Sequence, residues 1–535
     1  MPRLFVFAIG GTGERVLRSF TMLLASGGST FDNYEVFPVI IDYDKDNADK
    51  SRTVELLQNY VKIHNSAFAS HSLANNSNGQ SEQFFAAKLR NLEGLENYVF
   101  PFHPARENEK FREYIGYDDL AGKTLGTKAL LESLYDESQR ADTELNLDMT
   151  LGFKGNPNIG SVVFHTIGKT TEFAAFKSRF QPDSGDKVVI IGSLFGGTGA
   201  SGIPEIVKAI HNMHNNAKIA TILVLPYFSP MEKDLGAIVA SRFNSKTKAA
   251  LSFYKDSGLI NKINRVYYVG DPNPTSIPYS EGGKDQINNA NVVELIAAMM
   301  IEHYVAGRDP DPEHKEFKFS LDVNIMNRER LFIYDFDPLS VKHVLNHLVE
   351  LAIGLKCFHE EIESKKASSR GFYEIIGLDK VIGMDANGAK EDKLYNLCSA
   401  LGSFYFKYQA WLKEIDFEGK NNVPANSHRV GLCDMTYAYS DIILKGAINN
   451  ADNDAESTSF WRRLERMKGY FKGKGSKPVL TDGSLLACME NNLDVRGHYN
   501  PNSNSLKVGH EAEWVFADIL HATSVDVFKK LITDN

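Results

Sequence analysis

The chain has 535 residues, of which 43% are hydrophobic and 24% charged, and this balance is typical of folded globular protein rather than disordered chain. Its length exceeds that of one ordinary hydrophobic core, so we expect more than one domain. The formal net charge of −9 disfavours non-specific binding to nucleic acid, and no apolar run is long enough for a membrane span. The four scattered cysteines fit reduced thiols in the cytosol, so we expect a cytoplasmic protein.

Short apolar runs alternate with helix-period segments through the first half of the chain. The runs are rich in Val, Ile and Phe without strict alternation, as in strands covered on both faces. The expected strands are Arg3–Ile9, Val36–Asp42, Val188–Ser193, Ala220–Pro226 and Arg265–Val269. The expected helices are Glu14–Ala25, Gly202–Met213, Ala237–Lys255 and Asn289–Val305. This alternation predicts an α/β domain with a mostly parallel sheet flanked by helices.

The pattern changes at several points along the chain. Residues 64–82 are polar and predict a surface insertion. Residues 306–330 begin with a charged, proline-containing segment and predict a second insertion. Residues 331–360 include a predicted helix starting near Pro338, and residues 361–535 predict a separate C-terminal domain that is α+β or rich in helix.

Three segments combine glycines with the ends of predicted strands or helices. They are AIGGTGERV at 8–16, GFKGNPNIG at 152–160 and VVIIGSLFGGTGASGIPEI at 188–206. Glycines at strand-to-helix junctions let backbone N–H groups approach an anion, and the start of a helix adds partial positive charge. Thr12, Thr198 and Ser201 add hydroxyl groups. The segments therefore predict a phosphate site.

Two common nucleotide motifs fit poorly. The chain has no clean GxxxxGK[ST] phosphate loop. Gly197, Gly199 and Gly202 satisfy the dinucleotide pattern GxGxxG, but the strand that follows ends without an acid for a ribose. The first glycine loop has the converse defect, because Asp42 ends the second strand but Val16 replaces the third glycine. Each loop is half of a dinucleotide fingerprint.

The segment FGGTGAS at Phe195–Ser201 resembles the tubulin/FtsZ signature GGGTG[ST]G, with Phe195 and Ser201 in place of its outer glycines. The resemblance implies a GTP site and a long central helix. It implies phosphate contact by Gly196, Gly197, Thr198, Gly199, Ala200 and Ser201. The segment AIGGTGERV is similar to the first FtsZ glycine loop, which implies phosphate contact by Gly10, Gly11, Thr12 and Gly13.

Four further segments resemble later elements of that family, in the family's order. IDYDKDNA resembles the second loop and carries Asp44 as its acid, and GNPNIG resembles the third, with Gly155 and Asn156 near the γ-phosphate. LPYFSPMEKD resembles the fifth loop, which implies that Glu232 approaches the ribose. NNANVVELI resembles the start of the central helix, with Asn291 in the position that binds guanine.

The catalytic acids of this family polarise a water against the γ-phosphate held by the neighbouring subunit. The segment IYDFDPLSVKHVL is similar to the loop that supplies them, which makes Asp335 and Asp337 the candidates. Asp322 and Asn324 are an alternative. A carboxylate that only caps the following helix explains Asp335 or Asp337 equally well.

The resemblance implies that residues 1–305 form a nucleotide-binding domain that binds GTP or GDP with Mg²⁺. It implies hydrolysis coupled to head-to-tail self-assembly, with the C-terminal domain open to an unknown protein partner. Two other functions stay open: a GTP-binding interaction module that does not polymerise, and an NAD(P)-binding enzyme. The four cysteines lack CxxC spacing, and His498 and His510 lack metal-ligand spacing, so no motif for a protein-ligated metal is expected.

Overall fold

The computed structural model describes residues 1–28, 30–44, 47–68, 83–101, 109–120, 125–135, 143–149, 152–153, 155–230, 240–271, 275–277, 283, 287–307, 314–318, 330–331, 342–359, 375–378, 392–416, 429–430 and 485–533. Within these residues, seven parallel strands form one sheet in the order β3-β2-β1-β4-β5-β7-β9. They are β1 (Arg3–Ile9), β2 (Glu35–Ile41), β3 (Lys88–Leu89), β4 (Lys187–Ser193), β5 (Lys218–Val224), β7 (Arg265–Val269) and β9 (Lys315–Lys318). The chain winds outward in both directions from the adjacent strands β1 and β4.

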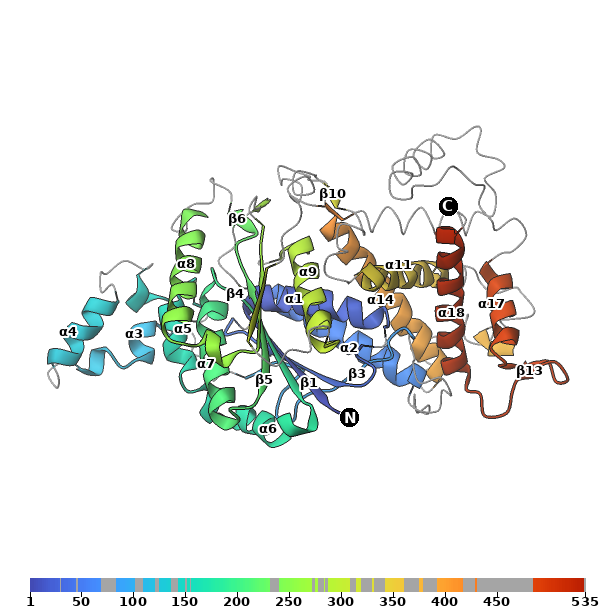
Figure 1. Ribbon diagram of the computed structural model, residues 1–535, viewed down its shortest axis with the longest axis horizontal. Coiled ribbons are helices and arrows are strands. Elements are labelled where there is room, and N and C mark those ends of the chain that lie inside the picture. The colour runs from blue at the N-terminus through green and yellow to red at the C-terminus, as the bar shows by residue number, and fades with distance from the viewer. Residues whose placement is uncertain are drawn as a thin grey trace.

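Both faces of this sheet are buried, which explains the unbroken apolar runs. Along β1, Leu4, Val6 and Ala8 join one hydrophobic cluster, whereas Phe5, Phe7 and Ile9 join the other. The first face is covered by α1 (Gly10–Ala25), α2 (Ala48–Phe68) and α9 (Val292–Val305). The second is covered by α5 (Pro157–Phe164), α6 (Thr171–Arg179) and α7 (Gly197–Met213). Figure 1 shows the sheet nearly edge-on between these layers.

Smaller elements surround the second layer of helices. Helix α8 (Ala240–Asp256) packs there through Tyr254, whose hydroxyl donates to Ala200 O at 3.0 Å. Helices α3 (Phe111–Tyr114) and α4 (Leu125–Leu134) extend away from the sheet at the left of Figure 1. Short 3₁₀ helices lie at Asp118–Leu120, Glu144–Asn146, Ile167–Lys169, Pro182–Ser184 and Ile260–Lys262.

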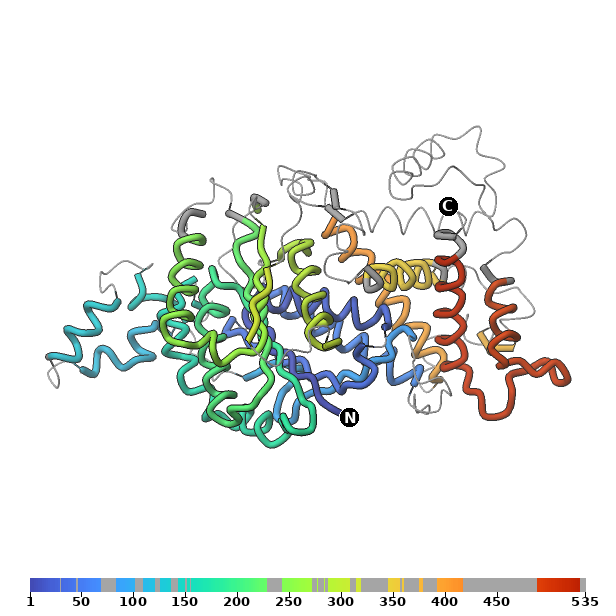
Figure 2. Tube along the Cα trace, in the orientation of Figure 1, coloured from blue at the N-terminus to red at the C-terminus, as the bar shows by residue number. Residues whose placement is uncertain are grey.

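The C-terminal helices share a hydrophobic cluster with the first face of the sheet. They are α11 (Lys342–Cys357), α14 (Lys393–Ile415), α17 (Leu485–Val495) and α18 (Ala512–Thr533). Figure 2 shows α14 beside the N-terminal helices, and the Asn59 side chain on α2 donates to Ala400 O on α14 at 2.8 Å. In the part of the chain that the structure describes, three strand pairs lie outside the large sheet: β6 (Phe228–Pro230) with β8 (Thr275–Ile277), β10 (Arg330–Leu331) with β11 (Arg429–Val430), and β12 (Tyr499–Asn500) with β13 (Ser505–Leu506).

The predicted α/β architecture with a parallel sheet is confirmed. The strands Arg3–Ile9 and Arg265–Val269 have the predicted bounds, and the other three differ by one or two residues. One prediction is wrong in part: residues 64–68 of the supposed surface insertion form the last turn of α2, because Ala67 and Phe68 are buried. Within the described residues, no helix has the length and apolar character needed to cross a membrane.

Candidate functional site

Two glycine loops meet at the carboxyl ends of β1 and β4. The backbone of Gly10 has φ = +70°, which favours glycine, and a Cβ atom there would lie 3.2 Å from Thr198 Cβ. Helix α1 begins at Gly10 and helix α7 begins at Gly197, so each helix starts at a glycine of its loop. In a doubly wound sheet, the point where strand order reverses is the usual place for a ligand, and here both loops lie at that point.

A third loop closes against the second. A Cβ atom on Gly197 would lie 3.1 Å from Asn156 N and 3.2 Å from Gly155 N, so a side chain there would press against that backbone. Gly155 itself has φ = +74°, and its carbonyl accepts a hydrogen bond from Lys246 Nζ at 2.6 Å. Helix α5 begins directly after Asn156. The structure therefore brings together three of the segments that the sequence singles out.

The three helices that begin here have no side-chain cap. Their N-cap residues are Ile9 for α1, Asn156 for α5 and Gly196 for α7, and none accepts a capping hydrogen bond with its side chain. Other helices are capped, as Thr170 caps α6 and Asp392 caps α14. Uncapped N-termini leave N–H groups for an external acceptor, and their dipoles favour negative charge. Three of them in contacting loops can hold a polyanion.

Two of the glycines allow a helix to pack closely on a strand. A Cβ atom on Gly13 would lie 2.8 Å from Ala8 C, and one on Gly199 would lie 2.5 Å from Ser193 O. Any side chain at these positions would push α1 or α7 away from β1 or β4. Gly13 and Gly199 are therefore needed for packing, whatever else they contact.

Two of the three loop hydroxyl groups, those of Ser201 and Thr12, have partners within the protein. Ser201 Oγ donates to Gly197 O at 2.7 Å, one turn earlier in α7. Thr12 Oγ1 accepts from Arg15 Nη2 at 3.3 Å. The backbone N–H groups are thus the clearest donors that these loops offer to a ligand.

The loop after β2 places acidic side chains beside the first glycine loop. Asp44 Oδ2 accepts from Gly283 N at 2.7 Å, and the preceding Asp42 accepts from Asp44 N at 3.2 Å. Asn47 Nδ2 donates to Asp42 Oδ2 and to Glu14 Oε2, both at 3.1 Å. Glu14 and Asn47 are not among the site residues predicted from the sequence, although a carboxylate directly after GGTG is a visible signal.

Burial changes the acidity of this carboxylate pair. Glu14 is fully buried, and burial followed by the charge of Asp42 raises the pKa of Glu14 well above its usual range. Burial also raises the pKa of Asp42 to about 6. Desolvation penalises the charged form of a carboxyl group, so both side chains favour a proton or a nearby cation.

A buried polar network joins the first loop to α2 and α9. Arg15 Nε lies 2.6 Å from Glu294 Oε1, and Arg15 Nη1 lies 2.9 Å from Asp49 Oδ2. The hydroxyl of Tyr227 accepts from Arg15 Nη2 at 2.8 Å and donates to Glu294 Oε1 at 2.6 Å. The network satisfies these buried charges and holds α1, α2 and α9 in fixed positions around the loops.

Asn291 is the N-cap of α9. Its Oδ1 atom accepts from Val293 N at 2.9 Å, and its own N–H donates to Glu294 Oε2 at 3.0 Å, so the two residues form a capping box. The oxygen of this amide is therefore used in the helix cap. The other predicted site residues, Glu232, Asp335 and Asp337, and the alternatives Asp322 and Asn324, lie outside the described residues.

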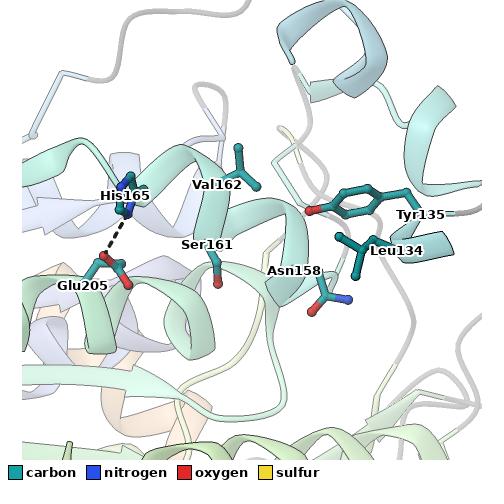
Figure 3. Close-up of a pocket in the computed structure, with 7 residues that line it drawn as sticks. All are labelled: Leu134, Tyr135, Asn158, Ser161, Val162, His165 and Glu205. Atoms are coloured by element: carbon teal, nitrogen blue, oxygen red, sulfur yellow. Dashed lines mark ion pairs between the residues drawn. The ribbon is translucent and has the colours of Figure 1, made fainter. Parts of the chain in front are cut away.

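A surface pocket of about 540 Å³ lies beside α5, and Asn158 of the third glycine segment is among its lining residues. It is lined by Leu134, Tyr135, Asn158, Ser161, Val162, His165 and Glu205. Figure 3 shows Asn158, Ser161 and Val162 on α5, facing Leu134 and Tyr135 at the end of α4. Glu205 on α7 lies at the other end of the pocket, with its Oε2 atom 3.7 Å from His165 Nδ1. The pocket contains none of the predicted site residues, so it is a separate feature.

Comparison of the chain with family models finds no match, and comparison with curated proteins also finds none. Within the part of the chain that the structure describes, no three His, Cys, Asp or Glu side chains group as a metal centre.

Proposed function

We propose that this chain is a tubulin/FtsZ-like protein that binds GTP and hydrolyses it as it assembles head to tail. The observation that carries the proposal is the contact of three glycine-bearing loops, each leading into a helix without a side-chain cap. A nucleoside triphosphate carries several adjacent negative charges, and these loops offer several adjacent groups of N–H donors.

The chain's own residues have distinct tasks in this proposal. Gly10 and Gly11 bring backbone N–H groups to the phosphates from α1, and Gly196 and Gly197 do so from α7. Gly155 and Asn156 close over the terminal phosphate at the start of α5. Mg²⁺, when bound, would neutralise phosphate charge, and Glu14 and Asp42, two buried carboxylates beside the first loop, would hold it.

Base recognition is assigned to the start of α9. The Nδ2 group of Asn291 is the donor we assign to the guanine edge, since its Oδ1 caps the helix. Hydrolysis is assigned to Asp335 or Asp337 of a neighbouring subunit, which would orient a water toward the terminal phosphate. A heterologous contact of this kind repeats into a filament unless it closes.

One further candidate has a specific observation in its favour. The strand order β3-β2-β1-β4-β5-β7 is also that of dinucleotide-binding domains, and Asp42 directly follows β2, where such domains hold a ribose. An NAD(P) site, however, uses one glycine loop for its pyrophosphate, whereas three loops meet here. A GTP-binding module that does not polymerise uses the same loops without Asp335 and Asp337.

Competition between nucleotides tests the proposal. A fluorescent GTP analogue is bound to the purified protein with Mg²⁺, and GTP, ATP and NADH are added as competitors. We expect GTP to displace the analogue at concentrations about tenfold or more below those of ATP and NADH, on the scale of one buried polar contact. Equal displacement by ATP, or displacement by NADH alone, would contradict the proposal.

A further inference from the structure

Two buried carboxylates beside the first glycine loop lack an ion pair. Glu14 is fully buried and Asp42 is 8% exposed, and neither lies within 4.0 Å of a basic group among the described residues. One amide group, Asn47 Nδ2, donates to both of them. The second oxygen of Glu14, Oε1, is buried and has no hydrogen-bond partner in the described structure.

Burial of these two carboxylates without an ion pair costs free energy. A buried carboxylate oxygen without a donor loses its hydration and gains nothing in return. The neighbouring acids Asp49 and Glu294 are compensated, because Arg15 pairs with both. The nearby Lys50 directs its ammonium group to the carbonyl of Asp44. Among the described residues, the charge of Lys50 acts on both Glu14 and Asp42 without an ion pair to either, so this pair is less fully compensated than Asp49 and Glu294.

The position of the pair next to an anion site indicates what supplies the remaining positive charge. A Cβ atom on Gly11 would lie 3.4 Å from Asn47 Nδ2, so the amide that joins the carboxylates touches the first glycine loop. Phosphate bound at this loop would be repelled by two carboxylates unless a cation lay between them. This step rests on the proposed function.

We propose that Glu14 and Asp42 form a binding site for one divalent cation, with Glu14 Oε1 as a direct ligand. Oxygen ligands, two carboxylates and ligand positions left for water or phosphate suit Mg²⁺ or Mn²⁺. The site has fewer than three acidic or histidine ligands, so it holds the metal weakly until phosphate adds its oxygens.

Direct measurement of Mn²⁺ binding without nucleotide tests this site. Mn²⁺ at micromolar to millimolar concentration is titrated into the metal-free protein, and free Mn²⁺ is followed by electron paramagnetic resonance. We expect one Mn²⁺ per chain, and a loss of affinity of about tenfold or more in Glu14→Gln and in Asp42→Asn. The matched control is Asp186→Asn, another buried carboxylate, which lies just before β4 at the opposite end of the sheet.

Thermal unfolding separates a metal ligand from a structural residue. Glu14→Gln removes a buried charge but keeps the shape and an oxygen for Asn47, so the metal-free variant should unfold at or above the wild-type temperature. Stabilisation by Mn²⁺ should disappear in this variant. Two results would overturn the inference: wild-type protein that binds no Mn²⁺, or a Glu14→Gln variant that binds Mn²⁺ as tightly as wild type. The first result is expected if Glu14 and Asp42 share a proton and bind no cation.

The same proteins distinguish this inference from the proposed function. Mn²⁺ binding that needs Glu14, in a protein that binds no GTP, supports the cation site and overturns only the nucleotide. GTP binding that is unchanged by EDTA and by Glu14→Gln supports the nucleotide and overturns only the cation site.

Discussion

Arg18 Nη2 on α1 lies 2.5 Å from Glu414 Oε2 on α14, although 396 residues separate the two in sequence. The same carboxylate accepts a hydrogen bond from Arg52 on α2. It also accepts one at 2.9 Å from the backbone N–H of Ala290, which precedes α9. One residue of a C-terminal helix thus holds the three helices that border the first glycine loop and the predicted base site.

Removal of this carboxylate should destabilise the protein. Glu414→Ala leaves Arg18, whose side chain is 5% exposed, as a buried charge without its partner. We expect a loss of about 3 kcal/mol in the free energy of unfolding, measured in urea, which is the scale for breaking a buried pair. Lys413→Ala, at the exposed neighbouring position, is the control and should change stability by less than about 0.5 kcal/mol. Equal stability of the two variants would show that the pair contributes nothing.

Gly197→Ala should abolish GTP binding with little effect on folding. The added Cβ would lie 2.9 Å from Phe153 Cβ and 3.1 Å from Asn156 N, so the third loop must move away from the second. Gly126→Ala on α4 is the matched control, since a Cβ there has no neighbour within 4 Å. Titration of fluorescent GTP and a melting curve give the two readouts. Wild-type affinity in Gly197→Ala would mean that the loop contact has no role in binding.

Two substitutions of Asn291 separate its helix cap from base recognition. Ser is a good N-cap residue but lacks the amide, whereas Ala lacks both functions. We expect both variants to lose about 1–3 kcal/mol of preference for GTP over ATP. Only Asn291→Ala should also lose about 1 kcal/mol of stability. If Asn291→Ser keeps the preference for GTP, the residue is only a cap.

Catalysis between subunits should appear as activity that depends on concentration. If Asp335 or Asp337 acts on a neighbour's nucleotide, GTP hydrolysis per subunit rises from nanomolar to tens of micromolar protein. Asp335→Asn or Asp337→Asn should slow turnover by about 100-fold and leave GTP affinity unchanged. Constant activity per subunit, with no assemblies in electron micrographs, would favour the nucleotide-binding module that does not polymerise.

The stability of the C-terminal helices should fall at acidic pH because of His521. Burial lowers the pKa of His521 to about 3, against an ordinary value of 6.5, and its Nε2 atom has no partner in the described structure. The unfolded chain therefore binds a proton below pH 6.5 that the folded chain does not bind. Stability due to neutral His521 is present above pH 6.5 and is lost as the pH falls toward 3.

The substitution His521→Phe should reduce the loss of unfolding free energy between pH 6.5 and pH 3. For His521 alone this loss is on the order of 4–5 kcal/mol. Urea unfolding at several pH values between 4 and 7.5 measures it. Burial also lowers the pKa of His64, so part of the slope should persist in the variant. An unchanged slope would mean that His521 does not titrate in this way.

Local patterns in the sequence predicted the sheet and the glycine loops. The strand Arg3–Ile9 is recognisable because a strand buried on both faces needs an unbroken apolar run. The glycine loops are recognisable because only glycine tolerates the backbone of Gly10 and the close approach at Gly197. The polar segment after residue 63 predicted a surface insertion, but its first residues continue α2. Two buried residues, Ala67 and Phe68, are enough to extend the helix.

Only the tertiary structure brought together the carboxylates and their partners. No pattern links Glu14 to Asp42 through Asn47, since that contact requires α1 and the loop after β2 to lie side by side at the end of the sheet. Arg18 and Glu414 likewise meet only because α14 packs across α1 and α2. The sequence by itself determined where the glycine loops lie, because backbone geometry is local. The positions of the charged side chains around those loops depend on the packing of distant helices, and the structure decided them.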